Sequence, residues 1–488
     1  SGILNLVLLP IYLSMFGMAS FGLIGILNIS LAWLPIFDFG LSQTVARQIA
    51  GISIKQTAVL AKKAEKARNN HIKISVGISA TIGVIIYFSS NYLATQWIPT
   101  SSISPKEIEL CIKLMAGILA LKVLEAPARS TLLGLQRHVP LNIINTLIIL
   151  AKGGGVIYLG ARLENSLIFF FAWYLLISVI GTLAFYITSQ KLFTRNRSEK
   201  NASKGEPYTL IVRTTESNHQ QSKLAKGITG ITILSLCLTQ LDKLTLTRLL
   251  DLKNLGEYTL ASTAAATIFT LALPISTSIY PRLSELYIND KSIEFEKKFL
   301  TSSEFLTVMC GAWAITLILF ARQAVFAWTG DAQIASTISS LIVILSTGNL
   351  LNTFVAIPIQ AQLAKGITRP TLTVWLGSVI VYIPLLSIIA PKFGPYGCSI
   401  LWLLINALVL YPGLRNGFLK AELGSYKNWA INYCFKLILP MLLAASIAKG
   451  AYIIALGVME QTRELDLAFA AISLLFAFTA GGLSSKAL

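Results

Sequence analysis

The sequence predicts an all-α integral membrane protein with about 14 transmembrane helices. We expect two pseudo-symmetric lobes of six helices each, followed by two additional C-terminal helices. Only 13% of the 488 residues are charged and 54% are hydrophobic, whereas soluble domains have about 25% charged residues. Apolar runs of about 20 residues, the length that crosses a bilayer, recur along the chain. Several landmark residues also repeat at an offset near 234.

The predicted spans account for most of the chain, in the order 3–16, 22–50, 72–90, 108–135, 139–161, 166–190, 226–251, 257–281, 301–328, 334–360, 371–390, 396–416, 431–456 and 465–485. Several exceed the thickness of a bilayer, so we expect their ends to protrude into water. The sequence starts at Ser1 rather than at a methionine. We expect the first helix to begin upstream of this residue and to act as an uncleaved anchor.

The net charge of +18 follows the pattern expected for membrane orientation. Connections predicted on one side carry 25 Lys and Arg residues, whereas those on the other side carry six. Basic connections remain in the cytoplasm. Because the number of spans is even, both termini are predicted to be cytoplasmic. The excess charge is therefore an orientation signal, and no nucleic-acid partner is expected.

The longest connection, residues 191–226, is polar and basic, as is typical of a linker between domains. Paired landmarks lie on its two sides, namely Gly22 with Gly256, Arg47 with Arg282, Arg137 with Arg369, and Gly160 with Gly394. Such repeats are common in transporters. We therefore predict an N-terminal lobe (1–190), a basic cytoplasmic linker (191–226), a C-terminal lobe (227–420) and two additional helices (421–488).

Several chemistries lack the residues that they would need. The five cysteines are scattered, so neither a disulfide framework nor a zinc site is expected. No nucleotide-binding P-loop is present, and the loop 91–107 has one acid and no histidine. We expect no catalytic site, no metal and no resident cofactor. The three histidines (His71, His138 and His219) are assigned to cytoplasmic connections, so a histidine-based proton relay is not expected.

Charged residues within spans are the candidate functional residues, because each costs at least about 2.5–3.5 kcal/mol in the bilayer. Span four carries Lys122, Glu125 and Arg129 on one helical face. Pro127 lies within this triad and should bend the helix. Span five adds Lys152, beside a run of three glycines (153–155) where another backbone can approach closely.

Two further spans carry acids. Span seven contains Asp242 and Lys243, adjacent residues whose side chains should diverge by about 100°. Span two ends in PIFDFGLSQTVARQIA, in which Asp38 and Arg47 fall on opposite helical faces and cannot pair. Pro35 and Gly40 predict a bend near Asp38. This acid therefore needs a partner on another helix or water, whereas Arg47 lies at the cytoplasmic end.

Each of these residues also has a purely structural interpretation. Interhelical ion pairs could serve only packing, and Arg47 could be an interfacial anchor. The interior nevertheless has more bases than acids, which favours an anionic passenger such as a phosphate or pyrophosphate group. The candidate substrate-binding residues are Arg47, Lys122, Arg129, Lys152 and Lys243, and the candidate gating or ion-coupling residues are Asp38, Glu125 and Asp242.

Four stretches resemble Wzx-type polysaccharide flippases of the multidrug/oligosaccharidyl-lipid/polysaccharide (MOP) exporter superfamily. FGLIGILNISLAWLPIFDFGLSQTVARQIA is similar to their second span, and QLDKLTLTRLLDLKNLGEYTLASTAAATIFTLALPISTSIYPRLSEL to spans seven and eight. LLGLQRHVPLNIIN and FGPYGCSILWLLIN are similar to their turns after spans four and eleven. The resemblance covers most of residues 1–420. It implies a MATE-like V-shaped fold whose central cavity is lined by spans one, two, seven and eight.

The resemblance also implies a function. The passenger would be an undecaprenyl-pyrophosphate-linked O-antigen, capsule or exopolysaccharide repeat unit, moved across the bacterial inner membrane by alternating access. Coupling to a proton or sodium gradient is left open, and polymerase and chain-length proteins of the pathway are candidate partners. A lipid II flippase and a multidrug antiporter are alternatives, and fourteen spans are typical of the former. A membrane polymerase or ligase is disfavoured, because no catalytic loop is evident.

Overall fold

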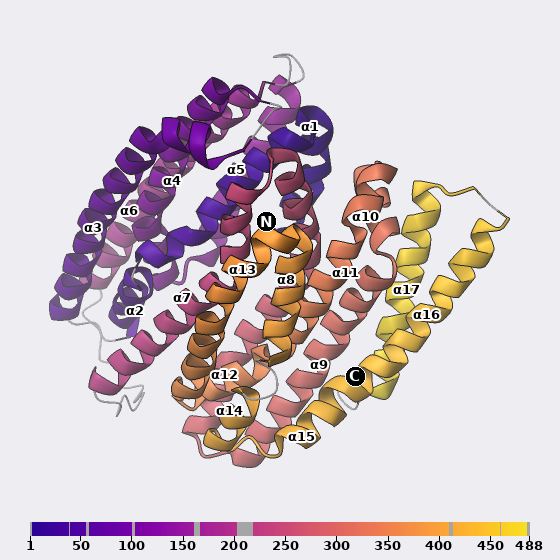
Figure 1. Cartoon of the computed structure of the whole chain (residues 1–488). Helices are drawn as coiled ribbons and strands as arrows, with labels where there is room; N and C mark the ends of the chain where they lie inside the picture. Colours follow the sequence, from indigo (N-terminus) through magenta and orange to yellow (C-terminus); the bar gives the residue numbers. More distant parts are fainter. Residues whose placement is uncertain are drawn as a thin grey trace. The chain divides into compact units, whose positions relative to one another are not determined.

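The computed structural model describes residues 2–38, 40–54, 58–99, 103–160, 166–202, 218–408, 413–458 and 460–485. These residues are almost entirely helical and contain no strand, which confirms the predicted all-α class. The chain forms two compact units (Figure 1). Unit 1 comprises Ser1–His219 and Leu250–Lys253, and unit 2 comprises Gln220–Leu249 and Asn254–Leu488.

Unit 1 is organised around α4, which packs against α2, α3 and α6 (Figure 1). Its elements are α1 (Gly2–Trp33), η1 (Leu34–Asp38), α2 (Leu41–Ile54), α3 (Ala58–Tyr92), η2 (Leu93–Trp97), α4 (Pro105–Gly134), α5 (His138–Gly160) and α6 (Leu167–Ala202). Because α4 has neighbours on several sides, a charged residue on this helix can be enclosed by protein rather than by lipid.

Helix α4 has well-defined ends. The Ser104 hydroxyl accepts a hydrogen bond from the Glu107 backbone N–H at 3.2 Å, and Pro105 occupies the first helical turn. This sequence, serine followed three residues later by glutamate, is a capping box. At the other end, a Cβ on Gly134 would overlap the carbonyl oxygen of Ala46 in α2. The glycine therefore allows α2 and α4 to approach closely.

Unit 2 contains the remaining helices, apart from the first two residues of α7 and of α8. They are α7 (Asn218–Leu249), α8 (Leu252–Ile288), α9 (Ser292–Leu319), α10 (Ala321–Thr329), α11 (Ala332–Phe354), α12 (Ala356–Ala364), α13 (Arg369–Leu408), α14 (Leu414–Lys420), α15 (Tyr426–Trp429), η4 (Ala430–Phe435), α16 (Lys436–Leu456) and α17 (Arg463–Ser484). Helix α11 packs against α9, α10 and α13. Asp331 starts α11 by accepting hydrogen bonds from the Gln333 and Ile334 N–H groups.

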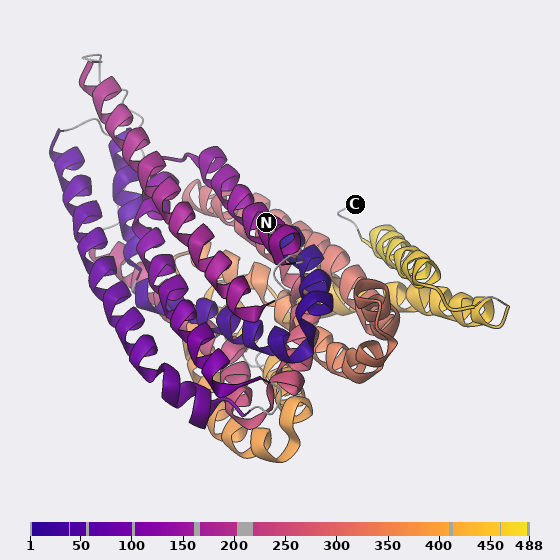
Figure 2. The ribbon, with the colours of Figure 1, turned by 90° about the horizontal axis from the view of Figure 1, so that it is seen from above.

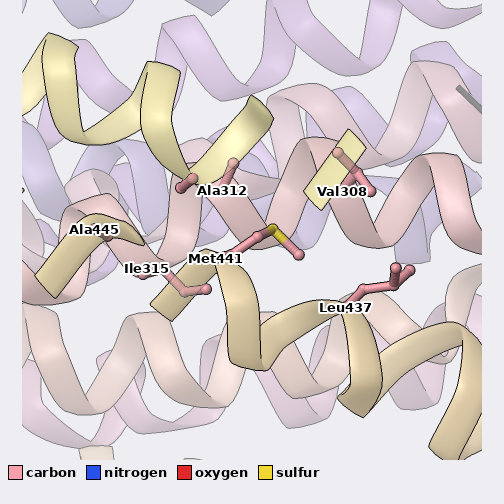
Figure 3. Close-up of a cluster of buried hydrophobic side chains, with 7 residues drawn as sticks. Val308, Ala312, Ile315, Leu437, Met441 and Ala445 are labelled. Carbon is pink, nitrogen blue, oxygen red and sulfur yellow. The ribbon is translucent and has the colours of Figure 1, made fainter. Parts of the chain in front are cut away.

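The C-terminal helices α16 and α17, in yellow, lie side by side (Figure 2). Both pack against α9. The apolar contact is formed by Val308, Ala312 and Ile315 of α9, Leu437, Met441 and Ala445 of α16, and Ala477 of α17 (Figure 3). Met441 is fully buried at the centre of this cluster. Gly311 and Gly481 lie against it, so the thioether fills space that these glycines leave open.

A polar contact fixes the opposite ends of these two helices. The Asp466 carboxylate is fully buried and accepts hydrogen bonds from the Tyr452 hydroxyl at 2.6 Å and the Gln461 amide at 2.9 Å. The Arg463 guanidinium donates to the Ala327 carbonyl of α10 at 2.8 Å. Burial of a carboxylate is tolerated here because its oxygens have donors.

In the described part of the chain, ten helical segments are long and apolar enough to cross a membrane. Two of them contain a glycine with non-helical backbone, Gly17 (φ 76°) and Gly394 (φ 53°), and each thereby joins two predicted spans. Helices α4 and α7 correspond to predicted spans four and seven and are not among the ten. Together these segments account for the predicted number of about 14.

The predicted division into lobes and linker remains a prediction. Helices α6 and α7 both continue into residues 191–226, because α6 ends at Ala202 and α7 begins at Asn218. Residues 203–217 of the predicted linker lie outside the described part of the chain. Helix α4 continues through Pro127 without a break, although a bend was predicted there. The Ser130 and Thr131 hydroxyls donate to the Pro127 carbonyl.

Candidate functional site

Unit 1 brings together four of the predicted site residues, which we call the cationic cluster: Lys122, Glu125 and Arg129 of α4 and Lys152 of α5. The Glu125 carboxylate is only 3% exposed and is bonded to the Lys122 ammonium group. Its other oxygen accepts from Arg129 Nη2 at 3.3 Å. Spacings of three and four residues place all three side chains on one face of α4, as the sequence predicted.

Arg129 is held by contacts beyond α4. Its Nη2 donates to Asn145 Oδ1 of α5 at 2.6 Å, and its guanidinium carbon lies 4.3 Å from the centroid of the Phe185 ring on α6. A planar guanidinium suits both contacts at once, because its edge donates hydrogen bonds while its face stacks on an aromatic ring. Arg129 is therefore fixed by three helices.

Lys152 has a different environment. Its Nζ lies 3.5 Å from the centroid of the Tyr174 ring on α6, and it interacts electrostatically with Lys122, Glu125 and Arg129. Among the described residues, no carboxylate lies within 4.0 Å of this ammonium group. An aromatic ring compensates a cation only partly, so Lys152 is the member of the cluster with the greatest need of an anion.

Aromatic rings continue from Tyr174 towards α1. Phe170 contacts Tyr174 with a centroid separation of 5.7 Å and contacts the Tyr12 ring of α1 at 5.4 Å. Phe16 of α1 contacts the same phenylalanine at 5.6 Å. The cation and the aromatic group thus meet at Tyr174, an arrangement that combines charge with flat apolar surface.

The glycines beside Lys152 serve a different purpose from the one that the sequence suggested. A Cβ at Gly153 would overlap the Leu8 side chain of α1, and a Cβ at Gly155 would overlap the Trp173 indole of α6. Side chains, not another backbone, occupy the space that these glycines leave. The Trp173 indole N–H also donates to the Ala151 carbonyl at 3.0 Å, which fixes the register of α5 against α6.

Unit 2 contains a second polar group on α7. The Asp242 carboxylate is 5% exposed and accepts a 2.5 Å hydrogen bond from the Tyr258 hydroxyl of α8. Lys243 Nζ donates to the Thr239 carbonyl at 2.8 Å and lies 3.5 Å from Asp242. The expectation that the adjacent side chains diverge is therefore wrong, because the long lysine side chain turns back along the helix.

Asp38 is located where the sequence predicted a bend. Helix α1 ends at Trp33, η1 covers Leu34–Asp38, Gly40 has φ 73° and α2 starts at Leu41. The Asp38 carboxylate accepts from the Ser42 backbone N–H at 3.0 Å and from its hydroxyl at 2.7 Å. It therefore satisfies a free N–H in the first turn of α2.

The interhelical partner of Asp38 is His71 of α3, whose Nε2 lies 3.2 Å from Asp38 Oδ1. His71 is 1% exposed and lies within Ala64–Trp97, a segment able to cross the membrane. His71 therefore belongs to a helix rather than to a loop, and its assignment to the cytoplasmic side stays a prediction. Polar residues before it suggested a loop, but α3 begins at Ala58 and runs through them. His138 likewise begins α5 rather than lying in a loop.

The predicted site residues thus fall into three groups. Lys122, Glu125, Arg129 and Lys152 lie together in unit 1, Asp38 lies elsewhere in that unit, and Asp242 and Lys243 belong to unit 2. Arg47 belongs to α2, but its side chain lies outside the described part of the structure. In the described residues, no cluster of three His, Cys, Asp or Glu side chains could hold a metal ion.

The cationic cluster has three bases and one acid. A surplus of positive charge in a partly buried setting is stabilised by an anion, and the nearby aromatic rings provide apolar surface for an attached organic group. The model of a family described as polysaccharide biosynthesis protein matches residues 1–287, more than half of the chain.

The chain belongs to the polysaccharide biosynthesis protein family.

Solved structures of transporters have the same fold as this family member. It aligns with the lipid II flippase MurJ in an inward closed conformation with a TM-score of 0.67 and 14% identity, covering 98% of this chain and 96% of MurJ. An outward-facing MATE family transporter of the MOP superfamily aligns with a TM-score of 0.52 and 16% identity, covering 86% of this chain and 92% of that transporter.

A MOP superfamily transporter from Pyrococcus furiosus aligns with a TM-score of 0.50 and 16% identity, covering 88% of this chain and 92% of its own. The sequence matches none of the curated proteins with which it was compared. The family match and the shared fold both agree with the predicted resemblance. The fold is one that these solved transporters also have.

Sequence reasoning missed the uncharged partners of the charged residues. Asn145 precedes Lys152 by seven residues on α5 and so lies on the same helical face, a signal that could have identified it. Tyr174, Phe185 and Tyr258 had no such signal, because aromatic residues are common in every span.

Proposed function

We propose that this protein is a flippase that moves undecaprenyl-pyrophosphate-linked oligosaccharide repeat units across the bacterial inner membrane by alternating access. The cationic cluster is the single observation that carries the proposal. Lys122 and Arg129 share one buried acid there, and Lys152, the third base, is compensated by an aromatic ring instead of a carboxylate. Membership in the polysaccharide biosynthesis family supports the glycan part of the substrate.

The proposed cycle follows from the physical properties of such a substrate. Lys122, Arg129 and Lys152 would attract the pyrophosphate group, while the prenyl chain remains in the lipid and the sugars enter the protein. Arg47 and Lys243 would provide further positive charge. The site must bind the substrate less tightly when it faces the far side, so that the substrate is released. A site with the same high affinity in both orientations would release its substrate slowly.

Asp38, Glu125 and Asp242 would act as gating or ion-coupling groups, with a proton or sodium gradient as the driving force. Asp38 is supported in this role by its place at the break between α1 and α2. Both termini would be cytoplasmic, and the polymerase and chain-length proteins of the pathway would receive the repeat unit on the other side.

A second candidate is a lipid II flippase, favoured by the alignment with MurJ over almost the entire length of both chains. A multidrug antiporter is a weaker candidate, because surplus positive charge suits a cationic drug poorly.

Reconstituted proteoliposomes would separate these candidates. Translocation of a fluorescent undecaprenyl-pyrophosphate oligosaccharide, lipid II and a cationic dye would be measured in parallel with the same preparation. We expect transport of the lipid-linked oligosaccharide that depends on Lys152. Transport of lipid II alone would favour the second candidate, and transport of the dye alone would refute both flippase proposals.

A further inference from the structure

Glu125 occupies an unusual position for an acid in an anion-binding site. Its buried carboxylate contacts two bases at once, with Lys122 three residues before it and Arg129 four residues after it. An anionic ligand would seek the same two cations. Glu125 therefore already pairs with the two cations that such a ligand would need.

The two bases depend on Glu125 to different degrees. Arg129 has independent anchors, since Asn145 accepts its hydrogen bond at 2.6 Å and Phe185 lies beneath its guanidinium group. The Lys122 side chain is 39% exposed and, among the described residues, has Glu125 as its ion-pair partner. Lys122 is thus the base that can leave Glu125 for a ligand without losing other contacts.

The same helix carries a simple ion pair for comparison. Glu109 and Lys113 of α4 are joined at 2.7 Å, one acid with one base, and both side chains are partly exposed. This pair neutralises itself, so it has no residual charge to offer. Around Glu125, by contrast, the cluster keeps a net charge of two positive units.

We infer that Glu125 is an internal counter-ion that competes with the anionic group of the ligand for Lys122 and Arg129. In the empty site it holds the two bases in place. When the ligand phosphate binds near Lys152, Lys122 transfers from Glu125 to the phosphate, and the glutamate charge then repels the ligand and limits its affinity. The inference rests on the proposed function, because it assumes that this cluster binds an anion.

Binding of inorganic pyrophosphate and of farnesyl pyrophosphate to the purified full-length chain would test this competition. The two probes distinguish a free phosphate ligand from a lipid head group. For Glu125→Gln we expect about tenfold tighter binding and slower release. The substitution removes a negative charge that repels the anionic ligand, and such a change is worth about a factor of ten in affinity. Glu109→Gln, the matched change on the same helix, should bind like the unmodified protein.

A compensated variant covers the case in which Glu125→Gln does not fold. Lys122→Gln alone should weaken pyrophosphate binding about tenfold. The double variant Lys122→Gln/Glu125→Gln removes both members of the ion pair. Its binding should return to within about threefold of the unmodified protein, because the base that attracts the ligand and the acid that competes with it are lost together. If the double variant binds as weakly as Lys122→Gln, Glu125 is only structural and the inference is overturned.

The failure of this inference is distinguishable from that of the proposed function. If neither probe binds, or if Lys152→Gln leaves binding unchanged, the cationic cluster is not the anion site and both ideas fall. If binding depends on Lys152 but Glu125→Gln does not tighten it, only the competition is refuted.

Discussion

His71 and Asp38 form a partly buried contact across 33 positions of sequence, with His71 Nε2 3.2 Å from Asp38 Oδ1. The contact joins α3 to the break between α1 and α2. The His71 Nδ1 atom is buried and makes no hydrogen bond to the described residues. Asp38 thereby links a helix start, through Ser42, to a neighbouring helix. A change at either residue should alter the geometry of this break.

Asp38→Asn should lower transport about tenfold while leaving membrane insertion intact. An amide keeps one acceptor oxygen but loses the charge that attracts both Ser42 and His71, a loss worth about 1 kcal/mol or more. Transport in proteoliposomes and expression level are the measurements. Asp331→Asn is the matched control, since asparagine caps a helix as well as aspartate does. Full transport by the Asp38 variant would refute its gating role.

His71→Ala should lower transport in the same direction, because it removes the interhelical partner of Asp38. Since the two side chains are in contact, their effects should not add. The double variant Asp38→Asn/His71→Ala would therefore transport about as slowly as the more severe single variant. Additive losses would mean that the contact has no functional role.

Lys152→Gln should weaken binding of a pyrophosphate lipid and slow its translocation about tenfold, because the base without a carboxylate partner contributes most to ligand attraction. Lys113→Gln is a suitable control, since Lys113 is already paired with Glu109. Equal effects of the two changes on translocation would show that general charge, rather than the cluster, attracts the substrate.

Tyr258→Phe should lower the free energy of unfolding by about 1.5–3 kcal/mol, the usual cost of removing a hydrogen bond to a buried charge. The hydroxyl that is lost is the 2.5 Å donor to Asp242. Tyr382 is equally buried, but its hydroxyl has no hydrogen-bond partner in the described residues. Tyr382→Phe should therefore leave thermal unfolding nearly unchanged, and equal melting shifts for both variants would contradict the assignment.

Met441→Ala should destabilise the packing of α16 against α9 by about 2–5 kcal/mol, because it opens a cavity in a fully buried cluster. Leu439→Ala, on the same helix but 61% exposed, should shift stability by no more than about 0.5 kcal/mol. Thermal unfolding in detergent would compare the two. Similar losses would mean that the outer face of α16 is also packed.

Local sequence was sufficient for much of the architecture. Apolar runs of bilayer length identified the helices, since lipid requires every backbone polar group to be bonded within the segment. Pro35 and Gly40 located the break before α2, because one restricts φ and the other tolerates the left-handed value of 73°. The spacing of Lys122, Glu125 and Arg129 placed them together, since residues three and four apart share a helical face.

Tertiary structure alone decided which groups these residues meet. The sequence indicated that Asp38 needed a partner but could not identify His71, and the polar stretch before His71 pointed to a loop instead of a helix. Tyr174 beneath Lys152 and Tyr258 beside Asp242 were equally hidden. The physical reason is that periodicity defines the faces of one helix, whereas the neighbour of each face depends on how helices distant in sequence rotate and pack.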